Sequence, residues 1–428
     1  AKVGGAELHN LSVTGAAANT DSAIAPSASA AGASTTVGSP SPSQSAQAVI
    51  SRIRRAHLIG VDWQGTPEVV QQGAAGMHKS LISAVDRLAG DLYELEAHFV
   101  FELLQNADDN RYSSELDDDP PSMRLSVHVP QTDAASDEAP FFMSVNNEQG
   151  LSAEDVVAMC DVNASSKKNR PGCTGHKGIG WKSTFAVSDC PHILSGAYTF
   201  KFDVTGPLGR LAYVTPTWVS EEEVAQLPAA VQQAHAAGGT VIYLPLRPAQ
   251  ALPSLVAGVA EAFQLLEDHH VTLLFFRRLR RVCLQYPDGR QVHLERTDLP
   301  DQAPVEGVVG ADVGAVRRQI TKACEDTSGG SSSSEDALIK YILHREEVKL
   351  PKGLSGQMTL AFPSGNASPS GSGEPDLPIG DEHKHELPLQ ALHVTLPVRM
   401  VGFRFAIQAP FDLVASRADL HEGAPANE

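Results

Sequence analysis

The feature of this sequence that most constrains its fold is a change of hydrophobic period along the chain. Residues 77–109 carry apolar side chains at intervals of three and four, the spacing of one α-helix face. Residues 122–129 and 141–145 read as strands, separated by a Pro- and Asp-rich segment. Ser152 followed by Asp155 predicts the start of another helix, because this pair can bind the free N–H groups of a first turn. The sequence therefore predicts an α+β fold.

Composition divides the chain into three predicted parts. Residues 1–45 are mainly Ala, Ser, Gly, Thr and Pro, which lack the apolar surface needed to offset ordering entropy, so we expect a disordered tail. We expect one domain over 46–250 and a second, partial α/β domain over 251–428. Gly-, Ser- and Pro-rich insertions interrupt the second domain at 326–336 and 363–376. Further strands are expected at 191–204, 209–216, 239–246, 393–400 and 403–410, and a short helix at 179–188.

Charge and cysteine content argue against several classes of protein. The formal net charge of -18 leaves no surplus of Lys and Arg for general nucleic-acid backbone binding. The 5 cysteines are an odd number without a CxxC pair, which disfavours a disulfide framework or a thiolate zinc site. The apolar runs are far shorter than a bilayer span, and the first residues lack a signal-peptide pattern. We therefore expect an intracellular protein without a membrane partner.

A polar stripe interrupts the helical pattern. Glu102, Asn106 and Asp109 are spaced by four and three residues, so an α-helix places all three on one face. No Lys or Arg lies between Glu96 and Asn110 to pair with them. A solvated helix surface is the simplest interpretation. Two carboxylates and an amide are also suited to cation binding or proton transfer, and both interpretations stay open on these residues alone.

A second polar segment, residues 165–183, is rich in glycine and lysine. Gly175, Gly178 and Gly180 lead into a helix-like segment, and glycine lets the backbone approach a phosphate group closely. An ordinary turn explains such a loop as well, because neither a Walker loop nor a Rossmann fingerprint is present. Positive charge is added by Lys167, Lys168, Lys177 and Lys182.

In their order, these motifs resemble those of the GHKL ATPase superfamily. A helix ending in ExxxNAxD is followed by VNNEQG at 145–150, by the glycine loop, and by a Gly-Thr pair at 239–240. FELLQNADDNRY, GHKGIGWKSTFAVSD and VRMVGFRFAIQAPFDLVASRADL are similar to the plant NO VEIN family and, less closely, to sacsin. The resemblance covers residues 46–428. It implies a two-layer α/β sandwich of the GHKL type, followed by the partial second domain.

The resemblance also implies a site for ATP and Mg²⁺. Glu102 would polarise the attacking water, and Asn106 would give its amide oxygen to the metal. Arg417 resembles the SRxxL arginine of a heat-shock chaperone and would reach the γ-phosphate; a surface arginine is the alternative. The other implied residues are Asn146, Gly150 and Thr240 at the adenine end, Lys167, Gly175, Lys177, Gly178 and Gly180 around the phosphates, and Asp109 at the rim.

One position departs from the superfamily's adenine pattern, DxGxG. Aligning Gly150 with its last glycine places Asn146 at the Asp and Glu148 at the first Gly. An amide oxygen still accepts a hydrogen bond from the adenine amine, but without negative charge. The NO VEIN pattern is similar here, which implies a family trait.

The implied function is ATP binding, with slow Mg²⁺-dependent hydrolysis that drives closure of the glycine-rich lid in a chaperone-like or assembly role for an unidentified protein client. The alternative is a nucleotide-binding scaffold without turnover, against which Glu102 argues. A histidine kinase needs its accepting His on a separate helix pair, whereas His98 lies four residues before Glu102. A homodimer, and a location in the nucleus or cytoplasm, are compatible with the resemblance.

Overall fold

The structure is a computed structural model of the 428-residue chain. It describes residues 41–92, 98–113, 119–130, 139–161, 180–247, 252–299, 316–325, 337–350, 355–366, 389–413, 419–425 and 427. The chain divides into two units, Ala1–Pro40 and Ser41–Glu428, and every described residue lies in the second. Within these ranges, none of the helices has the length and apolar character needed to cross a membrane.

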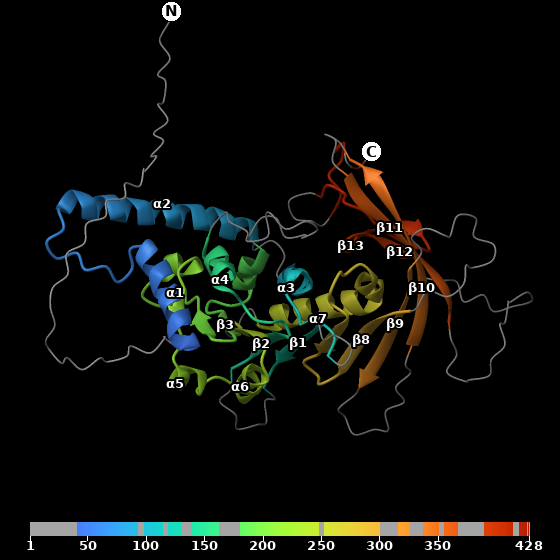
Figure 1. The fold of residues 1–428 in the computed structure, drawn as a ribbon, viewed down its shortest axis with the longest axis horizontal. Coiled ribbons are helices and arrows are strands. Elements are labelled where there is room, and N and C mark those ends of the chain that lie inside the picture. Colours follow the sequence, from blue (N-terminus) through green and yellow to red (C-terminus); the bar gives the residue numbers. More distant parts are fainter. Residues whose placement is uncertain are drawn as a thin grey trace, which may run out of the picture. The chain divides into compact units, whose positions relative to one another are not determined.

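The described chain contains helices and one large mixed sheet (Figure 1). The sheet order is β13-β12-β14-β11-β10-β9-β8-β7-β1-β2-β6-β3-β4-β5. Only β1 with β7 and β12 with β14 pair in parallel among these neighbours. The predicted α+β class is therefore confirmed. The strands are β1 Ser122–His128, β2 Phe141–Asn146, β3 His192–Ser195, β4 Tyr198–Lys201, β5 Thr217–Trp218, β6 Thr240–Pro245, β7 Arg281–Gln285, β8 Gln291–Asp298, β9 Val316–Glu325, β10 Ala337–Lys349, β11 Ser355–Asn366, β12 Gln390–Val394, β13 Leu396–Phe403 and β14 Ala406–Gln408.

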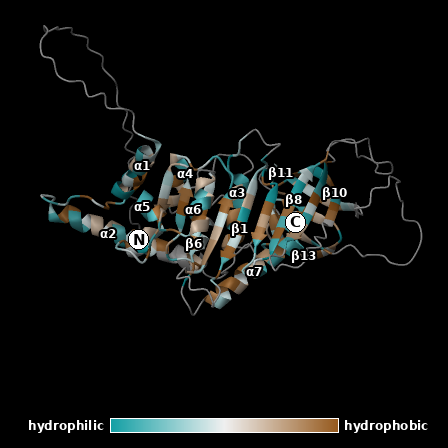
Figure 2. Cartoon of the chain, turned by 90° about the horizontal axis from the view of Figure 1, so that it is seen from below, coloured by the Kyte–Doolittle hydropathy of each residue, from teal (hydrophilic) through white to brown (hydrophobic). Residues whose placement is uncertain are grey.

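The helices pack on both faces of the sheet. Side chains alternate between the two faces along a strand. Phe142 of β2 joins a core with α3 and α7, whereas Phe141 and Met143 of the same strand join a core with α6. Figure 2 shows hydrophobic and hydrophilic residues interspersed along the strands. The helices are α1 Pro42–Ala56, α2 Glu68–Leu92, α3 His98–Asp109, α4 Ala153–Cys160, α5 Glu221–Val224, α6 Ala229–Ala236 and α7 Leu252–Asp268, with the 3-10 helices η1 Gly180–Ala186, η2 Gly209–Tyr213 and η3 His270–Leu274.

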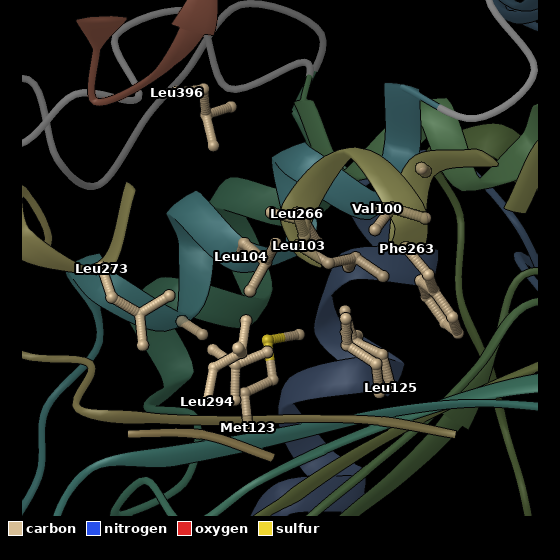
Figure 3. Close-up of a cluster of buried hydrophobic side chains, with 14 of the residues drawn as sticks. Val100, Leu103, Leu104, Met123, Leu125, Phe263, Leu266, Leu273, Leu294 and Leu396 are labelled. Atoms are coloured by element: carbon tan, nitrogen blue, oxygen red, sulfur yellow. The ribbon is translucent and has the colours of Figure 1, made fainter. Parts of the chain in front are cut away.

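The core beneath α3 fixes that helix on the sheet (Figure 3). Leu103 and Leu104 of α3 lie with Leu266 of α7 above Met123 and Leu125 of β1. All five side chains are buried. Burying one such side chain contributes roughly 1.5–3 kcal/mol, so several together hold α3 in a defined position.

Several predicted elements match the structure closely. Strands β1 and β2 occupy the predicted ranges, and the described residues of 77–109 fall in two helices, α2 and α3. The predicted capping pair is present: the Ser152 hydroxyl accepts from the Asp155 N–H, and the Asp155 carboxylate accepts from the Ser152 N–H.

One predicted strand is wrong. Residues 209–216 contain the 3-10 helix η2 rather than a strand. Leu211, Ala212 and Tyr213 are buried consecutively, which an alternating strand over one core does not allow. The Tyr213 ring packs 4.4 Å from that of Phe185, measured between centroids. Tertiary packing thus overrides the local strand preference of these residues.

The predicted segment boundaries remain predictions. Helix α7 begins just beyond residue 250, yet it shares a core with α3, and β7 pairs with β1. Helix α1 begins at Pro42, within the tail predicted to end at residue 45. Strand β11 continues through Asn366, into the insertion predicted at 363–376. The rest of that insertion, and all of 326–336, lie outside the described residues.

Candidate functional site

Helix α3 carries the polar stripe that the sequence predicts. Glu102 and Asp109 are only 7% and 4% exposed, and Asn106 is half-buried. Carboxylates are rarely buried unless they have a partner or a function. The stripe is therefore not a solvated helix surface.

The two acids at the end of α3 are held by a distant segment. Asp109 Oδ1 forms an ion pair with Arg277 Nη2 at 2.9 Å. The buried Asp108 accepts three backbone N–H bonds, from Arg277 at 2.9 Å, Arg278 at 2.8 Å and Leu279 at 2.9 Å. No local pattern points to Asp108, because the first of these donors lies 169 residues away. These bonds anchor α3 to the chain just before β7.

Three polar side chains lie side by side on neighbouring strands. Asn146 of β2 is paired with Thr240 of β6, which is paired in turn with Ser195 of β3. All three are buried, and the Ser195 and Thr240 hydroxyl oxygens are 2.5 Å apart. Because side chains alternate along a strand, Asn146 lies on the same face as Phe142. The ring centroids of Phe142 and Phe99 of α3 are 4.9 Å apart. The three polar side chains therefore face the side of the sheet that carries α3.

The Asn146 amide oxygen is a buried hydrogen-bond acceptor. Among the described residues, no donor reaches Asn146 Oδ1. Leaving a buried polar atom unsatisfied costs about 1–3 kcal/mol, so such an atom marks a place where a ligand or water donor fits.

The loop after β2 joins these strands to α3. The Leu151 N–H donates to Ser195 Oγ at 2.9 Å, and the Gln149 N–H donates to the Arg111 carbonyl at 2.8 Å. Gly150 adopts φ +93°, and a Cβ on it would lie 3.4 Å from Ser195 Oγ. The structure thus brings together three predicted adenine-end residues, Asn146, Gly150 and Thr240.

Sterics explain why the first residue of the Gly-Thr pair is glycine. Gly239 adopts φ +80°, and a Cβ on it would lie 2.1 Å from the backbone oxygen of Asn146. Only glycine therefore permits the close approach between the start of β6 and the end of β2.

Gly239→Ala should destabilise the fold far more than Gly238→Ala. Both glycines have positive φ, where a Cβ costs about 1–2 kcal/mol. A Cβ on Gly238 meets nothing within 4 Å, whereas a Cβ on Gly239 collides with backbone. We expect urea unfolding to show a loss of about 1–2 kcal/mol for the control and about 3 kcal/mol or more for Gly239→Ala. Equal losses would contradict the steric argument.

Most residues of the glycine loop lie outside the described residues. Among the predicted phosphate contacts, only Gly180 is described, and it is the first residue of η1. Lys182, counted above with the positive charge of the loop, is 3% exposed and turned inward. Its Nζ donates to the backbone oxygens of Met159 and Asp161 at 3.0 and 2.8 Å. The undescribed site residues are Lys167, Gly175, Lys177, Gly178 and Arg417.

A groove of about 660 Å³ lies elsewhere on the sheet. Its lining includes Arg124, Cys283 and His293, together with Gln233 of α6. Asn146 also lines it, but most lining side chains belong to the face that carries α6. We therefore treat it as separate from the site beside α3. Across the described ranges, no group of three His, Cys, Asp or Glu residues could hold a metal ion.

The comparisons with known proteins agree with one another. Residues 85–297 match the family model of the sacsin domain. The chain is 29% identical to Protein NO VEIN of Arabidopsis thaliana over 357 residues, which is 82% of this chain and 11% of that protein. It is 28% identical to human sacsin over 121 residues, 28% of this chain and 3% of sacsin. The chain thus spans a small part of either relative. Together these matches support a sacsin-like family for this chain.

Proposed function

We propose that the chain binds ATP between α3 and the strands β2, β3 and β6. The observation that carries this proposal is the buried Asn146 Oδ1, which lacks a donor among the described residues and lies beside the Thr240 and Ser195 hydroxyls. An adenine amine is a donor of the kind that this acceptor lacks. Gly150 and Gly239 let the backbone lie close to Ser195 and to Asn146, respectively, which holds these polar residues together.

The phosphate end of the proposed site is α3. Asn106 supplies an amide oxygen, a hard ligand of the type that Mg²⁺ accepts. Glu102 lies one turn earlier, and its buried carboxylate can hold and polarise a water molecule. Bound Mg²⁺ would neutralise charge on the triphosphate. Asp109, held by Arg277, borders this end.

The proposed activity is slow ATP hydrolysis that drives closure of the glycine-rich lid, in a chaperone-like or assembly role with a protein client. The finer fold assignment, a GHKL-type sandwich, belongs to the same proposal. It is supported by the cores that α1, α3, α4 and α7 form with one face of the sheet. A nucleotide-binding scaffold without turnover is the second candidate, favoured by the uncharged Asn146 at the adenine position.

Isothermal titration with ATP and Mg²⁺ tests the site through Asn146. Asn146→Asp should bind ATP more tightly than wild type, because a carboxylate accepts the amine's hydrogen bond more strongly. Asn146→Ala should bind about tenfold more weakly, since about 1.4 kcal/mol corresponds to tenfold. At a hundredfold excess over Kd, ATP should also raise the free energy of unfolding by about 2.7 kcal/mol.

The titration needs a folding control. Asn146→Asp buries a carboxylate, so its ligand-free form should be less stable than wild type, and all variants are titrated at a temperature where circular dichroism shows them folded. If wild type at millimolar ATP shows neither binding heat nor a higher melting temperature, the proposed site is wrong. If wild type and the two variants bind equally, Asn146 does not contact the base.

A further inference from the structure

Lys182 joins two segments that flank residues 162–179. Its Nζ donates to the carbonyls of Met159, in the last turn of α4, and Asp161, the residue that caps this helix. The neighbouring Trp181 indole N–H donates to the same Met159 carbonyl at 3.1 Å. Two successive side chains of η1 therefore hold the end of α4.

The contact has a clear electrostatic cause. The last carbonyls of a helix lack intrahelical partners and carry partial negative charge, which a cation stabilises. The last turn of α4 contains no basic residue of its own. Lys182 supplies that charge from across the 162–179 segment, at a buried position where the bonds are shielded from water.

The C-terminal end of η1 is also held by a side chain from a distant segment. Arg247 donates to the carbonyls of Phe185 and Ala186 at 2.8 and 3.0 Å. Ala186 is buried in the same core as Leu103 and Leu104 of α3. Lys182 thus connects α4 to a short helix that packs beside the helix carrying Glu102 and Asn106.

We propose that Lys182 is a positioning residue of the nucleotide site: it fixes the separation between Asp161 and Gly180, and with it the placement of η1 against α3. This inference rests on the proposed ATP site. Lys182 itself binds protein carbonyls and not phosphate, in contrast to the charge role that its sequence context suggests.

The contact is made by a titratable amine. Burial lowers the pKa of Lys182 to about 8. Among described residues, the ionisable groups that act on it are Cys160, whose pKa burial raises to about 12, and Asp161. The Cys160 thiol therefore stays neutral while Lys182 titrates. Because burial lowers this pKa, loss of the proton favours the buried amine over a solvent-exposed one, so the contact persists above pH 8.

A measurement without nucleotide tests the contact directly. The Trp181 indole N–H resonance, identified by its loss in Trp181→Phe, is followed by NMR from pH 6.5 to 9.5. In wild type it should shift with a midpoint near the Lys182 pKa of about 8, because Met159 O accepts from both side chains. Lys182→Met and Lys182→Arg should not titrate, since neither loses a proton in this range. Lys201→Met, which removes an exposed ion pair with Glu223, should titrate like wild type.

ATP affinity tests the positioning role. At pH 7, Lys182→Met should raise the Kd for ATP about tenfold, Lys182→Arg should stay within about threefold of wild type, and Lys201→Met should match it. Between pH 7 and 9 the wild-type Kd should stay below that of Lys182→Met, because the uncharged amine remains buried and still donates to the carbonyls. Either a wild-type indole that does not titrate or a Lys182→Met variant that binds as wild type overturns the inference. If wild type binds no ATP, the proposed function fails and the NMR titration alone decides Lys182.

Discussion

Glu102→Ala is expected to keep ATP affinity and to lose turnover by about 10² or more, the usual scale for removing a general base. A group that polarises the attacking water acts mainly in the transition state, so its removal changes the rate more than ground-state binding. Asn106→Ala should lose both, because a metal ligand also holds the triphosphate before reaction. The difference between two residues one turn apart on α3 is the informative result.

Phosphate release and isothermal titration measure the two effects separately. Glu102→Gln is the matched control, since it keeps the size of the side chain and removes its charge. It should lose turnover as Glu102→Ala does, which separates charge from the cavity that alanine leaves. Wild type that releases no phosphate above a Mg²⁺-free sample, or Glu102→Ala that hydrolyses as fast as wild type, would instead favour the scaffold without turnover.

Local patterns predicted the elements that local forces determine. Strands β1 and β2 followed from their side-chain pattern, and α4 from the Ser152 and Asp155 pair. The 3-10 helix η2 did not, because Leu211 to Tyr213 are buried by distant packing. The parallel pairing of β1 with β7 could not be predicted either, because these strands are far apart in sequence and no tight turn between them sets their register.

The candidate site divides in the same way. Glu102, Asn106 and the Gly-Thr pair could be found because helical spacing and motif order are visible along the chain. Ser195 could not, since its role rests on pairing with Thr240 across two strands. Lys182 shows a different limit: a lysine beside glycines suggests an exposed charge, and only the three-dimensional position reveals a buried one.

Asp108→Ala should lower the free energy of unfolding by about 3–5 kcal/mol, among the largest effects of a single substitution. The carboxylate satisfies the backbone N–H groups of residues 277–279, and each unsatisfied buried donor costs about 1–3 kcal/mol. Its negative charge also favours the charged form of the buried Arg296, whose pKa burial lowers to about 10. Removing it therefore leaves three buried N–H donors unsatisfied and takes away one of the two carboxylates that favour the charged form of Arg296.

Asp109→Ala is the matched control for that measurement. It removes the neighbouring carboxylate, which forms an ion pair with the half-exposed Arg277 side chain and accepts none of the three backbone bonds made by Asp108, so the loss should be smaller. Urea unfolding of both variants should show an unchanged m-value with a much lower midpoint for Asp108→Ala. Similar small losses would mean that another group satisfies residues 277–279. Residues 273–279 are held at two places: Arg296 and Arg318 donate to the carbonyls of Leu273, Leu274 and Phe276, and Asp108 accepts from the N–H groups that follow. Of these side chains only Asp108 belongs to α3, so a large loss for Asp108→Ala alone would identify it as the residue that anchors the helix to this segment.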